Sequence, residues 1–214
     1  MNDLNKREKI MGYLKEIKLG GFRRVYDEVL NRCLKAKRSH EDFILELLEQ
    51  EISVRRISAL KNRIQIAKFP QIKDLDTFDF KESAVDEILI RHFYEGDILK
   101  SRKNIIFMGG SGTGKTHLAS SIGLNIIRKG HKVKFWNLID LVNELEREKE
   151  EGKAGAIAQK MSKFSLMILD ELGYLPFSKN GAQLLFHLIS SWYEKMPLIM
   201  TTNLEFKEWD SLFN

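Results

Sequence analysis

The stretch Gly109-Gly110-Ser111-Gly112-Thr113-Gly114-Lys115-Thr116 decides the fold. It fits the phosphate-binding loop G-x-x-x-x-G-K-[ST] at every fixed position. Glycines there let backbone N–H groups turn inward around a phosphate, and the helix that follows adds the positive end of its dipole. Lys115 is therefore expected to reach the β- and γ-phosphates of ATP, and the Thr116 hydroxyl to bind Mg²⁺. The neighbouring His117 is included in the predicted nucleotide-binding stretch, although a helix residue without a chemical role is the favoured interpretation of it.

The loop stands where a strand gives way to a helix, which is the context that this motif requires. Short β-rich apolar runs alternate with helical segments from residue 104 onward, a pattern that predicts a parallel sheet with crossover helices. The expected strands are Ile105–Met108, Val133–Trp136, Leu166–Leu169 and Leu198–Thr202. The expected helices cover about 115–129, 138–151 and 180–195, the first of them ended by Gly130. The fold class is α/β, a P-loop parallel sheet flanked by helices.

Two further strands end in polar side chains. Leu166–Leu169 runs into Asp170 and Glu171, and the carboxyl ends of such strands are where ligands bind. Asp170 is predicted to hold the Mg²⁺ shell and Glu171 to act as general base for an attacking water. Leu198–Thr202 runs into Asn203, whose amide is placed to contact the γ-phosphate or that water. Each motif is weak alone, and the loop upstream makes both persuasive.

The N-terminal third carries the positive charge of the chain. Residues 1–68 hold sixteen Lys and Arg against ten Asp and Glu, whereas residues 69–214 hold nineteen against twenty. This asymmetry favours an acidic partner, with duplex DNA the first candidate, although a solvated helical surface would look the same. The predicted contacts to DNA include Arg55, Arg56, Lys61 and Arg63.

Apolar residues in this third recur at helical spacing. Gly20-Gly21 separates a first helix from a second, and Ser39 with Asp42 forms a capping box that predicts the start of a third. The stripes of the second and third helices are expected to form a core. The third stripe comprises Ile44, Leu47, Leu48, Ile52, Ile57, Leu60 and Ile64.

The predicted domains are a basic helical domain over 1–69, a connector with a helix over 70–103, and the nucleotide-binding core over 104–214. Ser83 and Asp86 look like a second capping box inside the connector. A single cysteine, Cys33, excludes an internal disulfide framework, and no apolar run is long enough to cross a bilayer. A cytoplasmic protein is expected.

With these motifs in place, the chain resembles the AAA+ ATPases, and within them the IstB-like transposition helpers of bacterial insertion sequences. The resemblance extends over essentially the whole chain. It rests on Leu14–Leu19, Phe78-Asp79-Phe80, Gly114–Ala119, the run Asp170-Glu171-Leu172-Gly173-Tyr174-Leu175-Pro176, and Thr202-Asn203-Leu204. It implies a five-stranded sheet in which the Asn203 strand lies between the loop strand and the Asp170 strand. It also implies ATP-dependent homo-oligomer assembly on DNA and delivery of a target site to a cognate transposase.

The end of the chain departs from the family. Only eleven residues follow Asn203, which leaves no room for the family's helical lid or for an arginine given to a neighbour's ATP. Since such an arginine can be worth about 10³ to 10⁵ in rate, slow ATP turnover by the chain alone is expected.

Three other functions remain open. A DnaC-type replicative helicase loader shares the same ATPase motifs and differs in its partner. A small-molecule P-loop kinase is disfavoured because residues 172–195 contain no arginine. A nucleotide-binding module without catalysis is disfavoured by Glu171 and Asn203.

Overall fold

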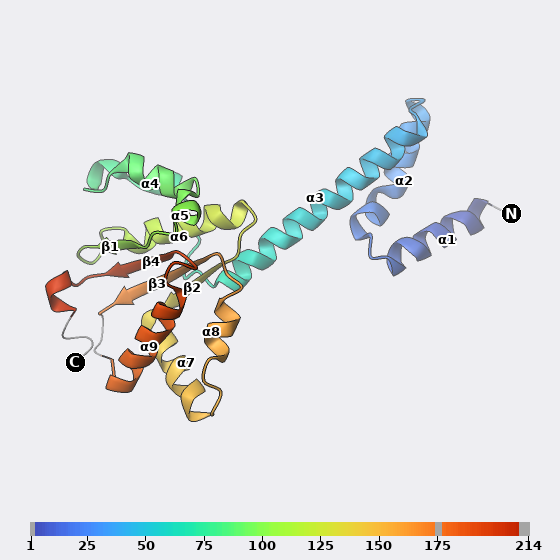
Figure 1. The fold of residues 1–214 in the computed structure, drawn as a ribbon. Helices are drawn as coiled ribbons and strands as arrows, with labels where there is room; N and C mark the ends of the chain where they lie inside the picture. Colours follow the sequence, from blue (N-terminus) through green and yellow to red (C-terminus); the bar gives the residue numbers. More distant parts are fainter. Residues whose placement is uncertain (1–2, 174–176, 210–214) are drawn as a thin grey trace. The chain divides into compact units, whose positions relative to one another are not determined.

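The computed structural model describes residues 3–173 and 177–209. Contacts within the chain divide it into two compact units, residues 1–62 and 63–214. Figure 1 labels their helices and strands. The predicted domain assignment, with its own boundary at residue 69, remains a prediction.

The first unit is helical. It contains α1 (Asp3–Glu16), α2 (Gly20–Lys35) and most of α3 (His40–Ala67), whose last residues belong to the second unit. The predicted capping box is present: the Ser39 hydroxyl accepts from the Asp42 amide, and the Asp42 carboxylate accepts from the Ser39 amide, both at 3.1 Å. This exchange satisfies two amides that the first turn of α3 leaves without helical partners.

A small core joins α2 to the first half of α3. Val29, Cys33 and Leu47 are buried in it, as the apolar stripe of α2 predicts. Beside it, the buried carboxylate of Glu51 accepts from the amides of Gly21 and Phe22 at 2.7 and 3.0 Å. Glu51 thus satisfies the free amides at the start of α2.

Most of the remaining α3 stripe is exposed, and Leu60 and Ile64 are half-buried, which corrects the prediction that the whole stripe forms core. Ile44, Leu48, Ile52 and Ile57 are each between 44% and 52% exposed. Periodicity identifies the apolar face of a helix but not what covers it. Within this unit, the core between α2 and α3 is centred on Leu47.

The second unit is built on a parallel sheet. Its described residues form four strands in the order β1-β4-β3-β2: β1 (Ile105–Met108), β4 (Leu198–Thr202), β3 (Leu166–Leu172) and β2 (Val133–Asn137). The Asn203 strand therefore lies between the loop strand and the Asp170 strand, as predicted. The resemblance implied five strands, one more than the described part of the chain contains.

Helices cover both faces of this sheet (Figure 1). On one face lies α6 (Lys115–Arg128), with α4 (Glu87–Tyr94) and α5 (Asp97–Ser101) beyond it. On the other lie α7 (Leu138–Glu150), α8 (Ala156–Met161) and α9 (Lys179–Trp192). Successive residues of β3 serve both faces: Met167 and Leu169 join the core with α7 and α9, whereas the Ile168 side chain reaches Gly123 of α6. This alternation follows from the period of two in a strand.

Short 3-10 turns occupy the connector and the end of the described chain: η1 (Leu75–Thr77), η2 (Phe80–Glu82) and η3 (Phe206–Glu208). The predicted box of Ser83 with Asp86 is wrong. Asp86 itself caps α4, accepting from the Leu89 amide at 3.1 Å, and Ser83 ends η2. Among the helices of the described residues, none is long and apolar enough to cross a membrane.

Candidate nucleotide-binding site

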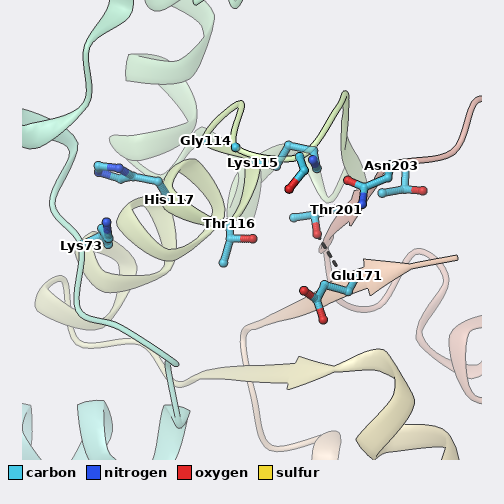
Figure 2. A pocket seen from close by; sticks show the side chains of 11 residues that line it. Lys73, Gly114, Lys115, Thr116, His117, Glu171, Thr201 and Asn203 are labelled. Carbon is cyan, nitrogen blue, oxygen red and sulfur yellow. Dashed lines mark hydrogen bonds between the residues drawn. The ribbon is translucent and has the colours of Figure 1, made fainter. Parts of the chain in front are cut away.

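The predicted motifs meet in one cleft at the carboxyl ends of β1, β3 and β4. The cleft has a volume of about 350 Å³. Figure 2 shows Glu171, Thr201 and Asn203 on one side of Thr116, with Lys73 and His117 on the other. The complete lining is Lys73, Ser111, Gly112, Gly114, Lys115, Thr116, His117, Glu171, Thr201, Thr202 and Asn203.

The backbone of the loop needs its glycines. Gly112 and Gly114 have φ of +77° and +87°, a region that side chains strain. At Gly114 space is lacking as well, because a Cβ would lie 2.5 Å from the ring of Phe78 in the connector. The loop and the connector are therefore packed directly against each other. Gly109, Gly110, Ser111 and Thr113 complete the loop between β1 and α6.

Lys115, the first residue of α6, turns back over the loop. Its ammonium donates to the carbonyls of Gly109 and Gly110 at 2.8 and 2.7 Å. Burial lowers the pKa of Lys115, and the carboxylates of Asp170 and Glu171 oppose that shift. A half-buried cation beside a glycine-rich loop at the start of a helix is suited to the terminal phosphates of a nucleotide.

Asp170 lies buried at the end of β3, where two hydroxyls hold its carboxylate. Thr116 donates to its two oxygens at 2.9 and 3.1 Å, and Thr201 of β4 donates to one of them. Carboxylate and hydroxyl oxygens are the hard ligands that Mg²⁺ prefers. The donor set of Thr116 and Asp170 therefore fits the predicted metal.

Glu171 is held in a strained conformation that turns its side chain to the cleft. Its φ is +67°, and the register of β3 on β4 shifts between Leu169 and Leu172. A bulge of this kind re-aims a side chain beside a site, and positive φ in a non-glycine residue is costly enough to need fixed neighbours. Two neighbours supply hydrogen bonds: Thr201 Oγ1 accepts from the Glu171 amide at 3.0 Å (Figure 2), and Asn137 donates to the carboxylate at 2.6 Å.

Asn203 lies exposed on the cleft wall directly after β4. The strand is anchored at this end, because Thr202 donates to the Leu172 carbonyl at 2.8 Å and accepts from the Leu204 amide at 3.0 Å. The amide of Asn203 is thus placed on the same wall as Glu171 by a fully buried strand. Its predicted contact with phosphate or water remains a prediction.

The connector is fastened to α6 beside the cleft. His117 Nε2 lies 2.8 Å from the Asp74 carbonyl, and the ring of Phe78 packs edge-on against the imidazole at 5.3 Å. Asp74 forms an ion pair with Arg128 at 2.6 Å, and that partner lowers the pKa of Asp74. His117 therefore joins loop and connector, while its predicted contact with nucleotide remains a prediction.

Sequence reasoning missed three polar residues of the site: Lys73, Asn137 and Thr201. Thr201 stands out only as a hydroxyl inside an apolar run, and Asn137 only as a cap before a helix, since its Oδ1 accepts from the Ile139 amide. Lys73 precedes the Phe78-Asp79-Phe80 run at no recognisable spacing. It lines the cleft and the adjoining hollow of about 370 Å³ that reaches Asp170 and Ser120.

The predicted DNA contacts all lie on α3. Arg56 and Lys61 are exposed and Arg63 is half-buried. Arg55 has an internal role, because it forms an ion pair with Glu51 at 2.7 Å and donates to the Lys18 carbonyl. That pair is the main cause of the lowered pKa of Glu51. Binding of DNA by these four residues remains a prediction.

Comparison with known proteins agrees with this geometry. The family model of the IstB-like ATP binding protein matches residues 12–214. The chain belongs to the IstB-like ATP-binding family. An ATP-binding protein of insertion sequence IS5376 from Geobacillus stearothermophilus is 39% identical over 175 residues, covering 81% of this chain and 70% of the relative. One of IS232 from Bacillus thuringiensis subsp. berliner is 33% identical over 210 residues, covering 98% and 84%.

Solved structures agree on the fold of this IstB-like protein. AMPPCP-bound DnaA from Aquifex aeolicus superimposes with a TM-score of 0.59 at 20% identity, over 67% of this chain and 45% of that one. The DnaC helicase loader gives 0.54 at 24% identity, over 65% and 86%. The fold is thus the AAA+ form of the P-loop sheet. The stretch 174–176 and the last residues from 210, which entered the family resemblance and the expected loss of a lid, lie outside the described residues.

Proposed function

We propose that this IstB-like protein hydrolyses ATP, assembles on duplex DNA when it binds ATP, and assists a transposase in choosing or delivering a target site. The observation that carries the ATPase is the arrangement around Asp170. The Thr116 and Thr201 hydroxyls bind its carboxylate, and Thr201 also accepts from the Glu171 amide. One hydrogen-bonded group therefore joins the loop to the proposed metal ligand and the proposed general base.

The residues divide the chemistry among them. The loop amides and Lys115 would bind the β- and γ-phosphates and neutralise charge that develops on them. Thr116 and Asp170 would hold Mg²⁺, which would supply further neutralisation of the phosphate charge. Asn203 would orient a water and Glu171 would accept its proton. The water oxygen bonds to the γ-phosphorus as the bond to the β–γ bridging oxygen breaks, giving ADP and phosphate.

Asn137 is a positioning residue in this scheme. Its amide donates to the carboxylate oxygen of Glu171 while its carbonyl oxygen caps α7. This hydrogen bond occupies one carboxylate oxygen of Glu171, and its release would free that oxygen to accept from the water.

The ATPase is tested by ADP release over a protein concentration series, with and without duplex DNA. Glu171→Gln should retain ATP binding and lose turnover by about 10² to 10⁴, the usual contribution of a general base. Glu205→Gln, a matched exposed carboxylate beyond the cleft, should leave turnover unchanged. Full turnover in Glu171→Gln would refute the assigned base, and an absence of turnover in every variant would leave a nucleotide-binding module.

Assembly is proposed for two reasons. The family is that of insertion-sequence ATP-binding proteins, and no arginine lines the cleft in the part of the chain that the structure describes. A neighbouring copy could supply one, which would make turnover rise faster than linearly with protein concentration. Strictly linear turnover, with a monomeric mass in ATP and DNA, would contradict assembly.

A replicative helicase loader is the second candidate, favoured by the likeness to DnaC. The likeness to DnaC supports the fold alone, whereas membership of the IstB-like family supports a function in an insertion sequence. Binding of the purified chain to the transposase encoded beside its gene, compared with binding to the host replicative helicase, separates the two. Retention of the helicase but not the transposase would favour the loader.

A further inference from the structure

Each strand of the sheet is preceded by a lysine. Lys103, Lys132, Lys163 and Lys195 lie one to three residues before β1, β2, β3 and β4 in turn. All four strands are parallel, so their amino ends share one edge of the sheet, opposite the edge that carries the nucleotide site. The lysines are thus far apart in the sequence and come together at one edge through the topology.

Hydrogen bonds donated by backbone amides join the four strand entrances into a row. The Leu198 amide donates to the Asn104 side chain at 3.1 Å, the Met167 amide to the Pro197 carbonyl at 3.3 Å, and the Ser165 amide to the Lys132 carbonyl at 2.7 Å. Neighbouring strands lie about 4.8 Å apart, so the row extends for about 14 Å. That length spans about four nucleotide steps of one DNA strand at about 3.4 Å per step.

This edge is strongly basic. The four entrance segments 101–104, 129–132, 162–165 and 193–197 hold six Lys and Arg against one acidic residue, Glu194. The rest of residues 69–214 must therefore be acidic, because that range holds nineteen Lys and Arg against twenty Asp and Glu. At one end of the row, Arg102, Lys103, Tyr193 and Glu194 line a hollow of about 570 Å³.

Helix C-termini also lie at this edge, and basic residues near them are stabilised by the helix dipole. That explanation accounts for part of the charge. Lys195 donates to the Ser191 carbonyl at the end of α9, Arg102 donates to the Glu194 carbonyl, and Lys129 pairs with Glu95. Lys103 and Lys163 also follow helix ends, those of α5 and α8, but these two and Lys132 make no such contact within the described residues. These three are exposed, and within residues 3–173 and 177–209 their ammonium groups have no hydrogen-bond or ion-pair partner.

We infer that Lys103, Lys132 and Lys163, flanked by Arg102 and Lys195, form a second DNA-binding surface that contacts the phosphate backbone of duplex DNA. The inference rests on the proposed association with DNA and adds a surface within the ATPase unit to the predicted contacts on α3. Exposed lysines in a row bind phosphates as point charges and read no base sequence. Binding there is expected to be sequence-tolerant and strongly dependent on salt.

The test compares three full-length variants, each with three or four substitutions, in a duplex-binding titration from about 50 to 200 mM salt. The first carries Lys103→Gln, Lys132→Gln and Lys163→Gln. The second, matched in charge, carries Lys81→Gln, Lys179→Gln and Lys207→Gln, which lie in the same unit and outside these entrance segments. The third carries glutamine at Arg55, Arg56, Lys61 and Arg63. ATP binding by each variant, measured with a fluorescent ATP analogue, checks that the nucleotide site is intact.

The first variant should bind DNA at least about tenfold more weakly than the wild type at about 100 mM salt. Its log–log salt slope should fall by about 0.9 for each phosphate that the variant no longer neutralises. The matched control should retain the wild-type slope. If the first variant and the control bind DNA alike, the inference is wrong, and an acidic protein partner would be the remaining use of the edge. If the wild-type chain binds no duplex with or without ATP, the proposed DNA association itself fails.

Discussion

The two edges of the sheet use the same side chain in opposite ways. At the carboxyl-end edge, Lys115 is half-buried, donates to two loop carbonyls and faces the carboxylates of Asp170 and Glu171. At the amino-end edge, Lys103 and Lys163 are exposed, and each contributes only a point charge. An enclosed lysine can recognise one group with fixed geometry, whereas exposed lysines act through summed charge over a wider surface. In the proposed function, the two edges would thereby separate chemistry on a small anion from binding of a polyanion.

Among substitutions that test this difference between the two edges, the largest effect is expected at Lys115. Lys115→Ala should weaken ATP binding about 100-fold or more, because charge-assisted hydrogen bonds to the terminal phosphates are worth about 1.5–3 kcal/mol each. Lys103→Ala removes the same charge from the opposite edge and should leave ATP affinity unchanged. Titration with a fluorescent ATP analogue measures both. Equal effects in the two variants would mean that overall charge, and not enclosure, governs nucleotide binding.

The sequence predicts the carboxyl-end edge well and the amino-end edge not at all. Asp170, Glu171 and Asn203 each follow an apolar strand directly, so their place could be derived once the loop fixed the fold. The amino-end lysines carry no local signal. Their summed positive charge is concealed because the net charge of residues 69–214 is close to zero. Only the strand order brings these lysines together.

The misses within the site have the same cause. Thr201 touches Asp170 across 31 residues and Asn137 touches Glu171 across 34. Both are ordinary polar residues until the register of β2, β3 and β4 is known. The exposed stripe of α3 is the converse case, because periodicity identified the apolar face without showing what, if anything, packs on it.

A substitution at Thr201 tests how the residues of the carboxyl-end edge position one another. Thr201→Val keeps the shape of the side chain but leaves the Asp170 carboxylate and the Glu171 amide each without one partner. Turnover should fall about 10- to 100-fold, since a small misplacement of a reacting group has effects of that size. ATP binding should change little, because Lys115 and the loop are untouched. Thr201→Ser restores the hydroxyl and should restore turnover, which simple destabilisation of β4 would not explain.

Lys73 is expected to give a smaller effect, because it combines features of both edges. It lines the nucleotide cleft as Lys115 does, but it is exposed as the amino-end lysines are, and in the described residues its ammonium has no partner. Lys73→Ala should weaken ATP binding only about three- to fivefold, consistent with the ~0.2–1 kcal/mol of an exposed ion pair. The effect should shrink at high salt. Lys81→Ala, in the same connector but outside the cleft, is the control; an equal effect there would remove Lys73 from the site.

The smallest effect concerns Lys134, the second residue of β2 and the buried lysine near the amino-end edge. Burial, with a lesser contribution from Lys68 and Lys160, lowers its pKa to about 8 from 10.5. Its ammonium donates to the Ile66 carbonyl at 3.2 Å and lies 5.0 Å from the centre of the Trp136 ring. The folded state therefore disfavours the proton, and the unfolded chain binds more protons between about pH 8 and 10.5. Stability must rise with pH across that window.

Lys134→Met, which keeps the length of the side chain without its charge, should flatten this rise. Urea unfolding at about pH 7.5 and 9.5 should show the wild type gaining stability relative to the variant at the higher pH. At the lower pH the variant should equal or exceed the wild type, because a buried cation is replaced by an apolar side chain of similar shape. Lys132→Met, two residues earlier and exposed, should show no such difference. A parallel pH response in Lys134→Met and the wild type would show that the buried ammonium does not titrate in this window. Burial would then not distinguish the pH response of Lys134 from that of the exposed lysines beside it.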